Sequence, residues 1–350
     1  MIRIAIATSK NPLPASDQAL AAALAKEGFD VRPAIWSSAQ PDWQDFDAVV
    51  VRSCWDYHLR AEEFLAWIAR LERSGIVVMN SPDLIRWNAN KVYLRELATA
   101  GIAMPDTVFI ESGTELDLTK VCTSRGWGSA VVKPTISASA YCTERRCSGL
   151  VRGPAMVQQY VAAIEIAGEW SLVYINGKFS HAVMKKPREG DFRVQTSFGG
   201  TVQVAQPSRE LLEFAETVLN RLAWPAMFAR VDVVADCASI QLMELEVIEP
   251  ELFSIWFRNR HAASRQQSMM TYSRCVRLKQ ERRPIRLTRG EKDRHETTIP
   301  GCSHIESSLP RSCRLGSDIS SSCASGRIRR VKSICKAEHA PVPGALVRQD

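Results

Sequence analysis

The stretch LMELEVIEPELF, residues 242–253, places four glutamates in or beside a segment that otherwise has the apolar character of a buried strand. A carboxylate is costly to bury unless a cation or hydrogen bonds compensate its charge. Side chains two residues apart in a strand lie on one face, roughly 6.6 Å apart. Glu244 and Glu246 therefore share a face, and the intervening Met243 and Leu245 are predicted to point into the core.

The segment FARVDVVAD, residues 228–236, precedes this strand and places Arg230 and Asp232 on one face. If it pairs with residues 239–250 as a hairpin, one face carries an arginine and three carboxylates. Such oxygen ligands suit Mg²⁺, which proteins hold with one or two carboxylates plus substrate phosphates. An arginine there neutralises phosphate charge. Spacing alone leaves a second interpretation open, the solvated outer face of an edge hairpin.

Basic residues upstream favour the phosphate interpretation. Lys133 ends the apolar strand SAVVKP, and the small-residue stretch TISASAY (135–141) follows it, so backbone amides can approach a phosphate there. The other basic candidates are Lys91 in a predicted helix, and Lys185 and Arg193 beside a predicted loop. Each alone is most often a surface cation. Together with three candidate Mg²⁺ ligands they indicate a site for phosphate and metal.

Two patterns of secondary structure divide the chain. Residues 1–88 alternate apolar strands with amphipathic helices, which predicts a small parallel sheet covered by helices. Residues 89–257 contain mostly short strands, an Asn176-Gly177 hairpin turn and one clear amphipathic helix over 209–223. The second region is therefore predicted to be α+β and mostly antiparallel.

Residues 258–350 differ in composition from the rest. They hold 20 Lys and Arg against 8 Asp and Glu, a net charge of +12, whereas the preceding residues carry −5. The segment has one aromatic residue, Tyr272, and no sustained hydrophobic periodicity, so we predict a basic tail of low order. Three interpretations stay open: disorder without a role, a nucleic-acid- or partner-binding arm, and translation of a shifted reading frame.

Several common classes lack support in the sequence. It contains no GxxxxGK[ST] loop, no GxGxxG after a strand and no GxSxG. None of the ten cysteines forms a CxxC pair, which favours free thiols of a reducing compartment. No apolar run approaches the ~18 residues of a membrane span, and the first residues lack the layout of a signal peptide. We therefore expect a cytoplasmic protein.

The motifs occur in a characteristic order: Lys91, VVKP ending near Lys133, MVQQYV (156–161), GEWS (168–171), HAVMKKP (181–187), GDFR (190–193), ARVD (229–232) and ELEVIEP (244–250). This order resembles the ATP-grasp superfamily, and is most similar to its glutathione-synthetase-like and cycloserine-biosynthesis-like members. The resemblance covers residues 80–257 and extends more weakly to the N-terminal sheet. It implies an N-terminal domain over 1–88 and an ATP-grasp domain over 89–257, whose central (89–155) and C-terminal (156–257) subdomains clasp ATP.

The resemblance also implies roles for single residues, with ATP and Mg²⁺ as cofactors. Lys91 and Lys133 contact the ATP phosphates; Gln158, Gln159, Tyr160 and Val161 form the hinge at adenine; Glu169 binds the ribose hydroxyls; Asp232, Glu244 and Glu246 bind Mg²⁺; and Lys185, Arg193 and Arg230 serve the acyl-phosphate end. Two features depart from the family pattern: Glu246 stands where asparagine is usual, and residues 135–141 lack glycine.

The implied function is an ATP-dependent carboxylate–amine or carboxylate–thiol ligase that acts on an amino-acid-like substrate through an acyl phosphate. Its expected partners are small-molecule substrates and further copies of the chain, and not a membrane or a nucleic acid. Arg52 and Asp56 are candidates to bind an amino acid, or else form local ion pairs. Strict alternation would turn Glu249 and Glu251 away from the metal if the strand continued unbroken, but Pro250 opposes that. Both therefore stay candidates to contact the substrate or to support the metal ligands. The alternatives are a nucleotide-binding protein or inactive relic without ligase activity, and a nucleic-acid binder that uses its basic tail.

Overall fold

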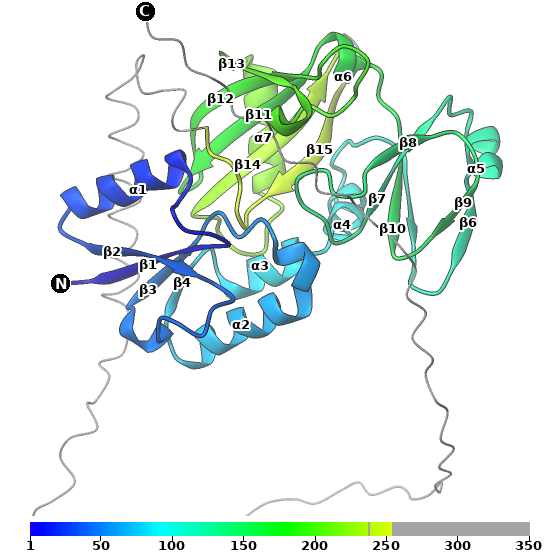
Figure 1. Cartoon of the computed structure of the whole chain (residues 1–350). Helices are drawn as coiled ribbons and strands as arrows, with labels where there is room; N and C mark the ends of the chain where they lie inside the picture. The colour runs from blue at the N-terminus through cyan, green and yellow to red at the C-terminus, as the bar shows by residue number, and fades with distance from the viewer. Residues whose placement is uncertain (237–238, 254–350) are drawn as a thin grey trace, which may run out of the picture. The chain divides into compact units, whose positions relative to one another are not determined.

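The computed structural model describes residues 1–236 and 239–253 (Figure 1). All of them belong to the first of two units of the chain, Met1–Leu287. The predictions for a low-order, frame-shifted or nucleic-acid-binding tail concern residues 258–350, which lie outside the described residues.

A four-stranded parallel sheet, in the order β2-β1-β3-β4, forms the N-terminal part, as the alternating pattern predicted. Its strands are β1 (Arg3–Thr8), β2 (Asp30–Ile35), β3 (Ala48–Val51) and β4 (Val77–Met79). Helix α1 (Ala15–Lys26) packs on one face, where Leu24 joins the core, and α2 (Ala61–Arg73) packs on the other through Phe64 and Trp67. Both faces are covered because the strands are apolar on both sides.

Two short helices follow this sheet, and the second of them is hydrogen-bonded to the strand that contains Leu245. Ser81 caps α3 (Pro82–Asn88) by accepting a hydrogen bond from the Leu84 amide, and α4 (Tyr93–Thr99) follows after a short turn. The Tyr93 hydroxyl donates to the Leu245 carbonyl over 2.9 Å. The turn between the helices carries Lys91, so the capped pair fixes this lysine against the strand that holds Glu244.

The middle of the chain forms an antiparallel sheet in the order β5-β10-β7-β8 and a small two-stranded sheet. The first consists of β5 (Thr107–Ile110), β7 (Ala130–Pro134), β8 (Glu144–Arg146) and β10 (Ala155–Gln159). The second pairs β6 (Glu115–Asp117) with β9 (Leu150–Arg152), and α5 (Leu118–Arg125) follows β6 directly. Leu118, Cys122 and Trp127 pack with Val157 into a separate small core.

A five-stranded antiparallel sheet, in the order β13-β12-β11-β14-β15, completes the described chain. Its strands are β11 (Glu169–Ile175), β12 (Lys178–Lys186), β13 (Thr201–Ala205), β14 (Phe228–Ala235) and β15 (Ile240–Glu246). Helix α7 (Arg209–Leu219) packs Leu211, Ala215 and Val218 against Leu172 and Val231. Asn176 and Gly177 have φ of 50° and 71°, which suits the predicted hairpin turn between β11 and β12.

The remaining elements are short: α6 (Ala163–Ile166) and three 3₁₀ helices at Trp43–Asp45, Tyr57–Arg60 and Thr196–Phe198. The α/β and α+β character of the two regions is confirmed. The boundaries at 88/89 and 155/156 stay predictions. Among the described residues, no helix combines the length and apolar character needed to cross a membrane.

Candidate active site

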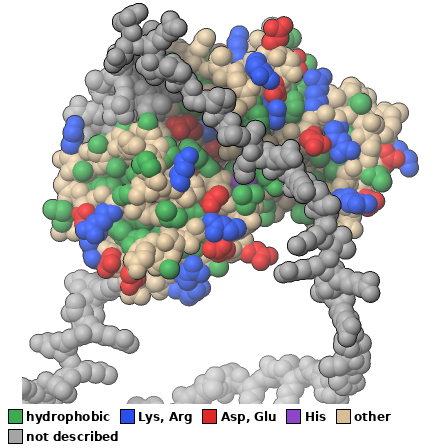
Figure 2. Space-filling model, viewed as in Figure 1, with side chains coloured by type: hydrophobic (Ala, Val, Ile, Leu, Met, Phe, Trp, Pro, Cys, Tyr) green, Lys and Arg blue, Asp and Glu red, His purple; other side chains and the backbone are tan. Residues whose placement is uncertain are grey.

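A cavity of about 500 Å³ opens between the middle sheet, the five-stranded sheet and the loop that follows β3. Each of the predicted site residues lines it: Lys91, Lys133, Gln158, Gln159, Tyr160, Val161, Glu169, Lys185, Arg193, Arg230, Asp232, Glu244 and Glu246. On the face drawn in Figure 2, basic and acidic side chains are interspersed over the described residues, and neither sign dominates.

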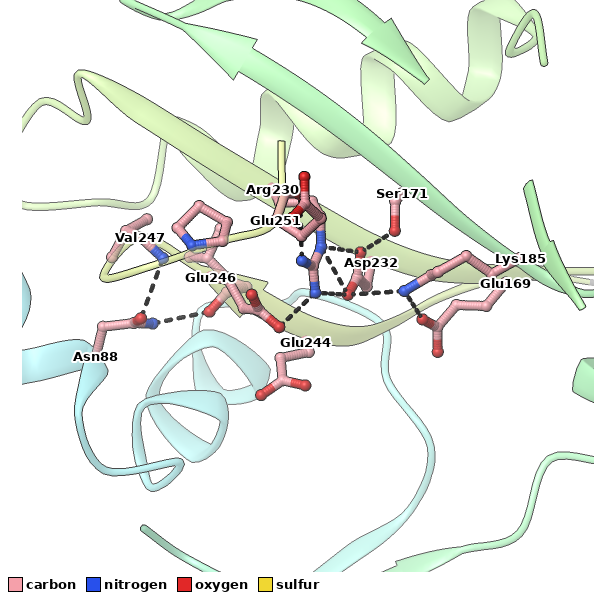
Figure 3. Close-up of polar contacts among 12 residues, drawn as sticks. Asn88, Glu169, Ser171, Lys185, Arg230, Asp232, Glu244, Glu246, Val247 and Glu251 are labelled. Carbon is pink, nitrogen blue, oxygen red and sulfur yellow. Dashed lines mark hydrogen bonds and ion pairs between the residues drawn. The ribbon is translucent and has the colours of Figure 1, made fainter. Parts of the chain in front are cut away.

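Three carboxylates converge in this cavity. Strands β14 and β15 pair as the sequence predicted, with Arg230 opposite Glu246 and Asp232 opposite Glu244. One carboxylate oxygen from each of Asp232, Glu244 and Glu246 lies within 4.8 Å of the others. Figure 3 shows these side chains on the same side of the hairpin. Three oxygen donors this close together fit a hard divalent cation such as Mg²⁺.

Protein cations compensate these acids. Lys91 forms an ion pair with Glu244, and Arg230 pairs with both Glu246 and Asp232, the latter over 2.8 Å (Figure 3). Burial opposes ionisation of Asp232 and Glu244, but the neighbouring cations outweigh it and lower the pKa of both. Each of the three carboxylates is therefore ion-paired with a lysine or arginine of the protein.

Glu246 is compensated less completely. Burial raises its pKa to about 7, and the charges of Glu244 and Asp232 add to the rise, although Arg230 opposes it. A carboxylate held next to two others is stabilised in its charged form by a bound cation. A divalent cation at the trio would offset the repulsion between Glu246 and its neighbours Glu244 and Asp232.

Strands β11 and β12 supply further polar groups next to the trio, Glu169 and Ser171 from β11 and Lys185 from β12. Glu169 and Lys185 are both buried and form an ion pair, and the Lys185 ammonium also lies 3.3 Å from Asp232. Burial raises the pKa of Glu169 even though Lys185 opposes the rise. Ser171, which sequence reasoning did not single out, donates a hydrogen bond to Asp232. The one feature of the sequence that could have indicated Ser171 is its position two residues after Glu169, which places both side chains on one face of the strand.

Lys133 differs from the other cations in the cavity. Among the described residues that line it, Lys133 is the one cation without an ion pair, since Arg193 pairs with Asp191 over 2.8 Å and stacks 3.7 Å above the Phe198 ring. Burial lowers the pKa of Lys133, although the Glu244 charge opposes this. An anion entering the cavity therefore finds one lysine that has no competing partner.

The loop after Lys133 lines the cavity with Ser137, Ala138, Ser139 and Ala140. Ser139 and Ala140 have φ of 53° and 57°, the left-handed region that glycine adopts most easily. The sequence prediction noted that glycine is missing here. The backbone nevertheless takes glycine-like geometry with other residues.

Three of the four predicted hinge residues use their hydrogen-bond donors within the protein, and one has a backbone amide that a ligand can use. The buried Gln158 side chain donates to Thr107 over 3.2 Å, so it ties β10 to β5. The amides of Gln159 and Tyr160 donate to the carbonyls of Asp106 and Ser129. The Val161 amide, in contrast, has no acceptor among the described residues. Within the hinge, Val161 is therefore the backbone donor that a ligand can use.

Met243 lies in the cavity, and the prediction that it points into the core is wrong. A β-bulge between Asp232 and Val233 places Leu242, not Met243, opposite Val233. Leu242 and Leu245 then occupy the core, while Met243 packs against the apolar cluster of Ile164, Val194 and Val234 with Tyr160 beside it. The bulge inserts one residue without changing composition, so no sequence pattern revealed it.

Glu249 and Glu251 also line the cavity, so strict alternation does not hold for them and both remain candidates to contact a substrate. Strand β15 ends at Glu246, and beyond it the alternation no longer applies. Glu251 accepts hydrogen bonds from the Phe253 amide (2.9 Å) and from Ser16 (3.3 Å). Burial and the Glu246 charge raise the pKa of Glu249 to about 8.

Arg52 and Asp56 have structural partners instead of facing the cavity. Arg52 is 3% exposed, pairs with Asp17 over 3.0 Å and donates to the Pro250 carbonyl over 2.9 Å. Asp56 accepts from Trp36 and Arg60. The structure thus shows the local-ion-pair alternative. Trp55 and Tyr57 of the same stretch do line the cavity, whereas the sequence reasoning had chosen Arg52 and Asp56 from it.

The parallel sheet, the two larger antiparallel sheets and the carboxylate trio together define the class: this is the ATP-grasp fold. Family comparisons agree with it. Residues 4–80 match the N-terminal domain family of D-cycloserine synthetase DcsG, and residues 145–254 match the ATP-grasp domain family of prokaryotic glutathione synthetase.

Individual relatives narrow the resemblance to ligases. The chain is 26% identical over 245 residues to the cycloserine biosynthesis protein DcsG of Streptomyces lavendulae, a match that covers 62% of this chain and 80% of that protein. It is 29% identical over 214 residues to tetrahydromethanopterin:alpha-L-glutamate ligase of Methanosarcina acetivorans, covering 54% of this chain and 64% of that protein.

Solved structures show the same fold. The crystal structure of D-cycloserine synthetase DcsG has a TM-score of 0.67 at 24% identity, and covers 78% of this chain and 99% of its own. D-alanine–D-alanine ligase from Bacillus anthracis has a TM-score of 0.57 at 15% identity, and covers 80% and 100%. The chain thus has the ATP-grasp fold and is similar to ligases with this fold. Neighbours with the fold have been solved with ATP, or with Mg and ADP.

Proposed function

We propose that this protein is an ATP-dependent ligase that activates a substrate carboxylate as an acyl phosphate and joins it to an amine through a C–N bond. One observation carries the proposal. Three carboxylates lie within 4.8 Å of one another in a cavity that is also lined by five lysines and arginines. Opposite charges gathered this densely suit a polyphosphate and its metal ion.

Each part of Mg²⁺-ATP has fitting groups. Asp232, Glu244 and Glu246 would hold Mg²⁺, which when bound neutralises phosphate charge. Lys133 would contact a phosphate directly, because no ion pair competes for it, and Lys91 would do so beside Glu244. At the apolar end of the cavity, Met243 and the Val161 amide suit adenine. Glu169 suits the ribose hydroxyls.

The chemistry requires positioning and positive charge more than covalent participation. A carboxylate oxygen of the substrate attacks the γ-phosphorus, the bond to the bridging oxygen breaks, and ADP leaves. The amine nitrogen then attacks the acyl carbon, phosphate leaves with the bonding electron pair, and the nitrogen loses a proton. Arg230, Arg193 and Lys185, which line the cavity, would supply the positive charge that stabilises the acyl phosphate as it forms.

Variants of the trio test the assignment. Glu244→Gln and Glu246→Gln each remove one anionic ligand, so Mg²⁺-dependent ADP formation is expected to fall by about 100-fold or more. The matched control is Glu213→Gln, a surface glutamate on α7 paired with Arg209, which should leave turnover unchanged. Unchanged turnover in both cavity variants would contradict the metal assignment.

The rival function is nucleotide binding without ligation. It predicts that ATP stabilises the protein while no ADP appears with any carboxylate and amine. Measuring ATP binding and ADP release on the same preparation separates the two functions. Release of ADP that depends on both a carboxylate and a nucleophile supports the ligase.

A further inference from the structure

One acid in the cavity is not explained by nucleotide or metal binding. Glu249 is 8% exposed and lines the cavity. It lies near the loop that follows β3, since its charge raises the pKa of both Cys54 and Tyr57 after the effect of burial. Its neighbour Ile248 packs in the same core cluster as Cys54 and Tyr57. Glu249 thus lies where the N-terminal α/β sheet meets the cavity.

Within the described part of the chain, the Glu249 carboxylate is compensated only by its own backbone amide and by the charge of Lys91, which both oppose the rise of its pKa without cancelling it. Among the described residues it forms no ion pair and no side-chain hydrogen bond with another residue. The other acids of this loop and hairpin have partners: Glu244 pairs with Lys91, Glu246 with Arg230, and Glu251 accepts from the Phe253 amide. A buried carboxylate without a side-chain partner is costly, so a ligand that supplies a positive group is the natural complement.

The positive group that would complement Glu249 is not the metal ion proposed for the carboxylate trio. The carboxylate oxygens that converge within 4.8 Å belong to Asp232, Glu244 and Glu246, and Glu249 is not among them. Two aromatic side chains of the stretch after β3, Trp55 and Tyr57, line the cavity, and Tyr57 lies within range of the Glu249 charge. Aromatic faces favour organic cations, whereas a hydrated metal ion prefers oxygen ligands on several sides.

We propose that Glu249 binds the ammonium group of an amino-acid substrate, with Trp55 and Tyr57 forming the apolar wall beside it. This inference rests on the proposed ligase function and names its substrate class: the molecule at this end of the cavity is an amino acid and not a hydroxy acid. A site built to bind an ammonium rejects an analogue that lacks it, because the buried carboxylate is then left unpaired.

The test compares amino acids with their matching hydroxy acids, for example alanine with lactate, in both enantiomers. The full chain is given Mg²⁺-ATP, and ADP release yields KM and kcat. Binding of each compound is measured separately by isothermal titration in the presence of a non-hydrolysable ATP analogue. The variants are Glu249→Gln, Glu249→Asp and the control Glu213→Gln, a surface glutamate on α7 that pairs with Arg209 and does not line the cavity.

The wild-type protein is expected to prefer at least one amino acid over its hydroxy acid by about 10- to 100-fold, the size of a charge-assisted hydrogen bond. Glu249→Gln should remove most of that preference by raising the amino acid's KM, while the KM for Mg²⁺-ATP changes less than about twofold. Glu249→Asp should keep part of the preference, and Glu213→Gln should keep it in full.

Three results would overturn the inference: no amino acid of the panel binds the wild-type protein, Glu249→Gln keeps the preference, or the variant weakens Mg²⁺ binding instead. The last would make Glu249 a metal ligand. Failure of the ligase proposal looks different, since amino acids would still bind and discriminate in the titration while no ADP appeared.

Discussion

Lys91 and Lys133 face the same group of carboxylates, yet they differ in their electrostatic partners. Lys91 is ion-paired with Glu244, which raises its pKa even though burial opposes the rise. Lys133 has no ion pair, and burial lowers its pKa. The first lysine therefore contributes to the folded state, whereas the second costs free energy until an anion arrives.

Substitution by methionine separates these roles. Lys133→Met should weaken ATP binding by about 10- to 100-fold, the loss of one charge-assisted hydrogen bond, and leave the melting temperature unchanged or slightly higher. Lys91→Met leaves Glu244 unpaired and should destabilise the protein by about 1–3 kcal/mol. Thermal unfolding without nucleotide and titration with an ATP analogue measure the two effects. Equal destabilisation by both variants would contradict the distinction.

The β14–β15 hairpin shows how far residue alternation predicts this site. The period of two correctly placed Arg230, Asp232, Glu244 and Glu246 on one face, because unbroken strand geometry decides that question. It failed where the geometry is interrupted. The bulge beside Asp232 turned Met243 into the cavity, and the strand's end at Glu246 freed Glu249 to enter it. Neither interruption changes the composition of the segment.

Short or polar elements were missed for a related reason. Strand β2 carries exposed Arg32 and Pro33 at an edge of its sheet, so it lacks an apolar alternation. Strand β8 and helix α6 span three and four residues, too few for a period to be visible. The long, half-buried elements were predictable because burial imposes a pattern on them.

Strand β12 carries a histidine that should make stability depend on pH. The His181 Nε2 lies 2.7 Å from the Leu252 carbonyl, which can only accept, so Nε2 carries the proton of the neutral ring. Nδ1 lies 2.9 Å from the Ser180 hydroxyl. Burial lowers the pKa of His181 to about 4, from an ordinary value of 6.5.

The sign follows from proton binding. Between pH 6.5 and 4 the unfolded chain binds a proton at this histidine and the folded chain does not, so His181 makes the protein less stable as the pH falls through this range. The full effect is on the order of 3 kcal/mol. Urea unfolding at pH 7, 5.5 and 4.5 should show a steeper loss for the wild type than for His181→Asn. Parallel curves would show that His181 does not titrate this way.

At the scale of the whole described chain, the cavity joins parts that are far apart in sequence. Tyr57 comes from the N-terminal α/β region, Lys133 from the middle sheet, and Asp232 and Glu244 from the five-stranded sheet. The family resemblance indicated this arrangement, because its motifs occur in a fixed order. The position of residues 52–58 after a strand indicated a ligand-binding stretch, but it did not indicate that Trp55 and Tyr57, and not Arg52 and Asp56, line the cavity.

A ligand that contacts several parts of the fold stabilises them together, so Mg²⁺-ATP should raise the melting temperature. At 100 times its dissociation constant the ligand adds about 2.7 kcal/mol, which corresponds to a rise of roughly 5–10 °C for a domain of this size. Mg²⁺ alone, or ATP with EDTA, should give a much smaller shift. The trio and the phosphates are both anionic, so the phosphates bind well only when Mg²⁺ compensates the charge of both groups. The variant Glu244→Gln/Glu246→Gln should lose the Mg²⁺-dependent part of the shift and keep any part due to ATP alone. Scanning calorimetry with and without EDTA measures both parts, and equal shifts under the two conditions would show that nucleotide binds without a metal at these carboxylates.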